Sequence, residues 1–169
     1  MEINTKMKEA LSRLEELKAK GELDISKDED VSLAVMNLIG AEEHLFFTAE
    51  KTGKPEYLEL LNEVREERKK MMKLLLPKTE GETWCMSKHL LSASMRMMEV
   101  ATKLQTEGRK DEAKDMFDGA YKVYSMFWAV RLEILQGSDL KCELNTINNK
   151  EKPWTTEDIV GRLVDCCKE

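Results

Sequence analysis

The stretch VSLAVMNLIGAEEHLFFTAEK, residues 31–51, decides the fold of this chain. Apolar residues recur three and four positions apart along it, and no proline interrupts them, which is the pattern of an α-helix. Two apolar stripes cover most of the helix circumference: Val31, Val35 (or Ala34), Leu38, Leu45 and Ala49 in one, and Met36, Ile39, Phe46 and Phe47 in the other. A helix that is apolar on most sides is usually enclosed by neighbours, so we expect other helices to pack around it.

The rest of the chain supplies such helices. Helical patterns occupy residues 2–20, 55–76, 79–106 and 111–135, with glycine or proline near most of their ends. Only 8 Gly and 3 Pro occur among 169 residues, a scarcity that favours long helices over turn-rich sheets. We therefore predict an all-α protein in which residues 1–136 form a single helical bundle of about five main antiparallel helices.

The C-terminal part of the chain has a different pattern. Residues 137–153 are polar and carry no helical periodicity, so we predict a connector. Residues 154–169 contain a last short helix with an apolar side of about three turns, which is too short to be stable alone in water. We expect this tethered helix to dock on its own bundle, on a second copy of the chain or in a groove of a partner.

Charge and hydropathy exclude several classes of protein. The formal net charge of -6 argues against general nucleic-acid binding, which needs a basic surface to neutralise phosphates. The longest uncharged run, residues 31–41, is far shorter than the roughly 18 residues of a membrane-spanning helix. The first ten residues are charged where a signal peptide would be apolar. We predict a cytoplasmic protein that binds neither nucleic acid nor membranes, with its 4 cysteines as free thiols.

Polar residues at two places indicate a candidate metal site. Glu42, Glu43 and His44 interrupt the apolar surface of the central helix, and Cys85 and His89 lie four residues apart on one face of a later helix. Zinc accepts such a mixture of sulfur, nitrogen and oxygen ligands. One interpretation is therefore a site inside the bundle for zinc or another small ligand, built on these five residues.

The same glutamates have a second interpretation, a structural network of ion pairs. An ionised carboxylate in a helix interface is costly unless it is paired, and the planar guanidinium of arginine suits it. Either Glu42 or Glu43 could contact an arginine of a neighbouring helix, and Arg96 could pair with Glu99 along its own helix. The expected network consists of Glu42, Arg65, Arg68, Arg96 and Glu99.

Named catalytic motifs do not occur in the sequence. It has no P-loop or dinucleotide-binding fingerprint. A di-iron helix needs Glu three residues before His, but Ala41 and Met86 occupy those positions before His44 and His89. We therefore expect a non-enzymatic binding or scaffold protein that acts through a protein partner or by self-association. A metal- or small-ligand-binding protein is the alternative.

Overall fold

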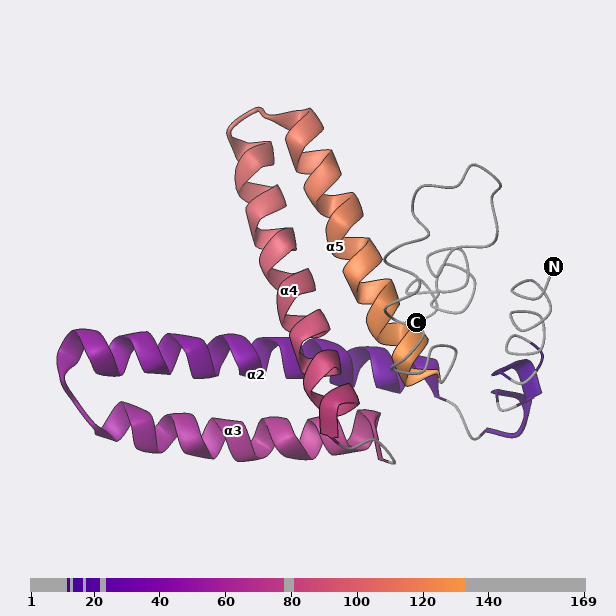
Figure 1. Ribbon diagram of the computed structural model, residues 1–169, viewed down its shortest axis with the longest axis horizontal. Coiled ribbons are helices and arrows are strands. Elements are labelled where there is room, and N and C mark those ends of the chain that lie inside the picture. The colour runs from indigo at the N-terminus through magenta and orange to yellow at the C-terminus, as the bar shows by residue number, and fades with distance from the viewer. Residues whose placement is uncertain (1–11, 13, 17, 22–23, 78–80, 133–169) are drawn as a thin grey trace.

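The computed structural model describes residues 12, 14–16, 18–21, 24–77 and 81–132, shown in colour in Figure 1. Within them lie the helices α2 (Ile25–Thr52), α3 (Glu56–Leu75), α4 (Gly81–Thr106) and α5 (Lys110–Arg131), and no strand. The predicted all-α class is confirmed. Most of the helix expected at 2–20, and all of the connector and the last helix expected at 137–169, lie outside the described residues.

The central helix α2 is held at both ends by side-chain and backbone caps. Asp24 is its N-cap, and the Asp24 carboxylate accepts a hydrogen bond from the backbone N–H of Lys27 at 3.0 Å. At the other end, Gly53 adopts a left-handed conformation with φ of 65° and donates its N–H to the carbonyl of Ala49. A side chain at this position would be strained, so glycine is what allows the chain to turn toward α3.

The four helices form two antiparallel hairpins. The first hairpin is α2 and α3, joined by residues 53–55, and the second hairpin is α4 and α5, joined by residues 107–109. Figure 1 shows the second hairpin crossing the first: α4 passes over α2, and the C-terminal end of α5 lies beside the N-terminal part of α2. The bundle is thus built from two crossed hairpins, and each hairpin extends beyond the crossing.

The hydrophobic core lies at the crossing. Trp128 and Phe127 of α5 are fully buried there, with ring centroids 5.8 Å apart in an edge-to-face arrangement. The other fully buried large apolar side chains come from each of the remaining three helices: Val35, Met72, Leu75 and Leu91. The crossing therefore holds the two hairpins together by burial of apolar surface.

Two polar contacts between α2 and α5 lie beside this core. Arg131 Nη2 donates to the carboxylate of Asp28 at 2.5 Å, and the hydroxyls of Ser32 and Tyr124 are 2.7 Å apart. Burial raises the pKa of Asp28 above its ordinary value, although the guanidinium of Arg131 opposes the shift. These contacts fix the register of α5 on α2 in a way that apolar packing alone would not.

Candidate functional site

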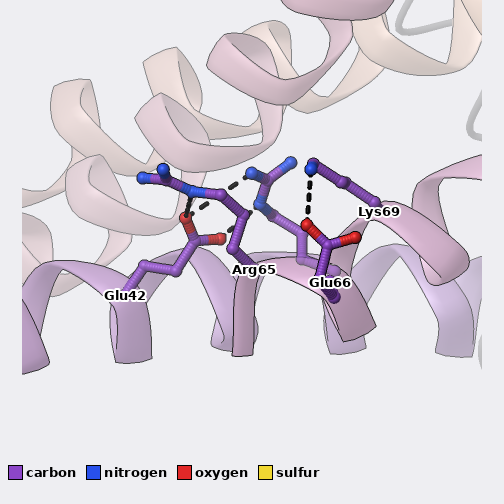
Figure 2. A network of polar contacts seen from close by, with 5 residues as sticks. Glu42, Arg65, Glu66 and Lys69 are labelled. Carbon is purple, nitrogen blue, oxygen red and sulfur yellow. Dashed lines mark hydrogen bonds and ion pairs between the residues drawn. The ribbon is translucent and has the colours of Figure 1, made fainter. Parts of the chain in front are cut away.

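Glu42 lies between α2 and α3, and two arginines of α3 hold its carboxylate (Figure 2). Arg65 Nε donates to Oε2 at 2.9 Å, Arg68 Nε donates to Oε1, and Arg68 Nη2 lies 3.5 Å from Oε2. The two arginines are three residues apart, so one face of α3 presents both of them to α2. The side chains of Glu42 and Arg68 are only 12% and 8% exposed, whereas that of Arg65 is 46% exposed.

The charge of Glu42 is stabilised by these contacts. Burial alone would raise the pKa of its carboxyl group, but the hydrogen bonds from Arg68 and Arg65 outweigh burial and lower the pKa below its ordinary value. Glu42 is therefore an ionised carboxylate at neutral pH, shared by two guanidinium groups. The neighbouring pair of Glu66 and Lys69 in Figure 2, at 2.6 Å, is exposed to solvent and contributes little.

A second ion-pair group joins α2 to α4. Arg96 Nη2 donates to the carboxylate of Glu43, and Arg96 Nη1 donates to Glu99 Oε2 at 2.6 Å. The side chains of Glu43, Arg96 and Glu99 are close to half exposed, so water screens this group far more than the Glu42 group. The structure thus brings Glu42 together with Arg65 and Arg68, and Arg96 together with Glu43 and Glu99.

An open cleft of about 560 Å³ lies in the angle between α2 and α4. Its lining includes Gly40, Glu43, His44 and Phe47 of α2, and Met95, Arg96 and Glu99 of α4. The single guanidinium in the cleft is shared by two carboxylates, so the charged groups that face it satisfy one another. The cleft therefore presents both charged and apolar side chains to solvent.

The residues proposed as metal ligands lie in different surroundings in the structure. Glu42 and Glu43 are paired with arginines, His44 lines the cleft, and Cys85 and His89 are exposed on the N-terminal half of α4. In the part of the chain that the structure describes, no group of three or more His, Cys, Asp or Glu side chains is placed to hold a metal ion. The metal site remains a prediction from the sequence.

Phe46 and Phe47 differ from the expectation for the central helix. They belong to an apolar stripe that we expected neighbours to enclose, but they are 45% and 50% exposed. Along this part of α2 the last printed contact with the second hairpin is the Glu43–Arg96 ion pair, and an open cleft, which Phe47 lines, separates α2 from α4. The Asp28–Arg131 contact was not expected either, because a pair separated by 103 residues leaves no local signal in the sequence.

Large apolar side chains are exposed on both hairpins beyond the crossing. We call Phe46, Phe47 and Leu58 the distal face of the first hairpin, and Met98, Phe117 and Tyr121 the distal face of the second hairpin. These six side chains are between 37% and 50% exposed. Other large apolar side chains, such as Leu60 and Val100, are exposed on other sides of the same helices. Single exposed apolar residues are ordinary on protein surfaces, whereas a contiguous apolar patch marks a contact surface.

Comparisons with protein-family models, curated proteins and solved structures find no match to this chain. Among the described residues, no helix is long and apolar enough to cross a membrane. The two ion-pair groups, the cleft and the two distal faces are therefore the features from which a function can be inferred.

Proposed function

We propose that this protein is a cytoplasmic, non-enzymatic binding or scaffold protein that acts through protein–protein contacts made by its two distal faces. The observation that carries this proposal is the continuity of these faces with the buried core. Met98 lies two helical turns after the fully buried Leu91 on the same side of α4. Phe117 and Tyr121 continue the row of α5 that contains Tyr124 and Trp128, in steps of four, three and four residues.

The ion-pair groups support the same proposal. The acidic and basic side chains that looked most capable of chemistry are engaged with one another, and each group links two helices. Glu42 joins α2 to α3, and Glu43 joins α2 to α4. Their role in this proposal is to hold the hairpins in position, so that the distal faces are presented as rigid helical surfaces. Such surfaces suit the recognition of another helical protein.

Photo-crosslinking in cells tests this proposal. A photoreactive amino acid is placed at position 47 or 117, one on each distal face, and at position 60 as a control. Leu60 is 46% exposed but lies two residues from Leu58, on the opposite side of α3. We expect discrete protein adducts from positions 47 and 117 and far fewer from position 60. The absence of adducts at both positions, or the same adducts at all three, would refute the proposal.

A further inference from the structure

The cleft between α2 and α4 has two walls, one from each helix. The wall on α2 is a single stripe whose members recur three and four positions apart: Gly40, Glu43, His44 and Phe47. The charged members of the wall on α4 are Arg96 and Glu99. The volume of about 560 Å³ lies within the range of small-ligand sites, which is roughly 300–1,000 Å³. The cleft is therefore large enough for a small organic ligand or for a side chain of another protein.

The charged groups of the cleft are two carboxylates and one guanidinium. Arg96 Nη1 donates to Glu99 Oε2 at 2.6 Å, and Arg96 Nη2 donates to Glu43 Oε2. Both bonds use Oε2, whereas a carboxylate has two oxygens that can each accept hydrogen bonds. One positive charge balances only one of the two negative charges. With histidine counted as neutral, the cleft therefore keeps a net negative charge and an Oε1 acceptor on each wall.

The position of Arg96 shows what the two carboxylates can hold. One guanidinium reaches both of them, so acceptors from α2 and from α4 lie close enough together to share a single planar cation. The side chains of Glu43, Arg96 and Glu99 are between 44% and 47% exposed. Pairs that are this open to water are weak, so a cation from solution can reach the carboxylates and compete with Arg96.

Gly40 is the member of the cleft that helix stability does not explain. Glycine inside a helix is less favourable than alanine, and close packing against another element is a common reason to find it there. Gly119 of α5 has this reason, because a Cβ built on it would lie 2.6 Å from Met97 Cε. A Cβ built on Gly40 meets no atom within 4 Å. Gly40 therefore leaves open space in the wall of the cleft, where a ligand can approach the backbone of α2.

Phe47 supplies an aromatic ring one turn after Glu43. The side chain is 50% exposed, and its ring contacts that of Phe46 edge to face with centroids 5.3 Å apart. The face of an aromatic ring attracts a cation and also packs against an apolar stem. The stripe of α2 thus offers open space at Gly40, then a carboxylate, then an aromatic ring.

We propose that this cleft binds a monovalent organic cation, with its guanidinium or ammonium group at Glu43 and Glu99 and its apolar stem along Phe47. The net negative charge favours a cation over an anion, and the aromatic ring favours an organic cation over a metal ion. The formal net charge of -6 of the whole chain also attracts cations to its surface. A free amine and a lysine or arginine side chain of another protein share this chemistry. The inference goes beyond the proposed function, because the cleft can bind a free cation whether or not the distal faces contact a protein.

A chemical-shift titration of the ¹⁵N-labelled full chain with N-acetylarginine amide tests the site. We expect saturable shifts of the amides of residues 40–47 and 95–99, and no such shifts with N-acetylcitrulline amide, which has a similar shape without the charge. Glu99→Gln should weaken binding about tenfold, because the ligand loses a hydrogen bond to a charged group. Glu112→Gln is the matched control and should bind like the unaltered chain. Glu112 also pairs with an arginine three residues away on its own helix and is 59% exposed, but it lies outside the cleft.

Arg96→Gln distinguishes a cation site from an anion site. It removes the guanidinium that competes for the two carboxylates, so N-acetylarginine amide should bind more tightly than it does to the unaltered chain. Loss of binding in Arg96→Gln would overturn the proposal, and so would equal binding of N-acetylarginine amide and N-acetylcitrulline amide. Circular dichroism verifies that the variant is folded.

Gly40→Leu tests whether the open wall belongs to the site. The new side chain occupies space of the cleft and should weaken binding of N-acetylarginine amide about tenfold. Leucine favours a helix more than glycine does, so the midpoint of urea denaturation should not fall. A stable Gly40→Leu variant that binds like the unaltered chain would overturn the assigned site.

Photo-crosslinking from position 47 identifies the source of the cation. If a partner protein supplies it, the adducts should be lost when Glu99→Gln is added. Adducts that persist in this variant, together with binding of N-acetylarginine amide by the purified chain, assign the site to a free amine. An absence of saturable binding, while positions 47 and 117 still crosslink, would refute the cation site and retain the proposed function. Saturable binding without crosslinks would refute the proposed function and retain the site.

Discussion

Glu42 is the charged residue on which the first hairpin depends most. It is nearly buried, and the guanidinium of Arg68 beside it is buried as well. Removing one member of such a pair leaves the other as an unpaired charge in a medium that solvates it poorly. Glu42→Ala should therefore lower the free energy of unfolding by about 3 kcal/mol, measured as the midpoint and slope of urea denaturation.

Glu43→Ala is the matched control for this measurement. Glu43 is the next residue of the same helix and also pairs with an arginine, but both partners are close to half exposed. Exposed pairs contribute about 0.2–1 kcal/mol, because water solvates either charge when the other is removed. Equal losses of stability in the two variants would show that burial does not distinguish the two ion-pair groups.

The lowered pKa of Glu42 predicts a dependence of stability on pH. Because the folded-state pKa lies below the ordinary value of 4.5, the folded chain binds this proton less readily than the unfolded chain. The contribution is thus complete above about pH 5 and is lost as the pH falls through the folded-state pKa. We expect the stability difference between the unaltered chain and Glu42→Gln to be constant at neutral pH and to shrink in acid.

The difference between the two proteins is the quantity to measure, because Asp28 acts in the opposite direction. Its raised pKa means that acid relieves the cost of burying its charge, which partly masks the loss at Glu42 in the unaltered chain. Asp28 is present in both proteins, so its effect cancels in the difference. A stability difference that stays constant down to pH 3 would contradict the assignment of Glu42 as a stabilised carboxylate.

The sequence predicted which residues belong to the ion-pair groups, but it did not predict which partner each of them would meet. Charged residues inside an apolar helical pattern need partners, and this requirement points to Glu42 and to the arginines three residues apart on the next helix. The place of Glu42 between Leu38 and Leu45 also predicts its partial burial, but the sequence could not decide which arginine each of Glu42 and Glu43 would meet. That choice depends on the rotation of α2 against α3, which is set by the packing of both helices together.

At the scale of the elements, two glycines of α2 offer opposite predictions. Gly40 lies within the helix, and a Cβ built there meets no atom within 4 Å, so Gly40→Ala should stabilise the protein by about 0.5–1 kcal/mol. Gly53 has φ of +65°, where a side chain costs about 1–2 kcal/mol, so Gly53→Ala should destabilise it. Thermal unfolding of the two variants measures both shifts. Shifts of the same sign would contradict the assigned cap.

The helices themselves could largely be read from the sequence. Pro55 and Pro77 predict the third helical segment, and α3 runs from Glu56 to Leu75 between them. Gly108, with φ of 80°, marks the turn between α4 and α5. Local signals of this kind are strong because proline and glycine restrict or free the backbone at a single residue.

At the scale of the whole molecule, the sequence did not reveal the crossing of the hairpins. Helical periodicity shows which side of a helix is apolar, but it does not show which neighbour covers that side or for how much of its length. Phe46 and Phe47 illustrate the limit, because their spacing is that of core residues although they are 45% and 50% exposed. The same pattern would arise whether a helix is covered by its own chain or by another.

Hydrogen exchange should therefore divide each hairpin into two parts. Amides near the crossing, such as residues 35–39 and 125–130, lie among several helices, whereas within the described part of the chain residues 44–52 and 98–106 lie chiefly beside one neighbouring helix. Segments with fewer buried contacts open locally at lower free energy. We expect the distal amides to exchange at least about tenfold faster than those at the crossing, and equal protection of both parts would show that each hairpin is equally stable along its whole length.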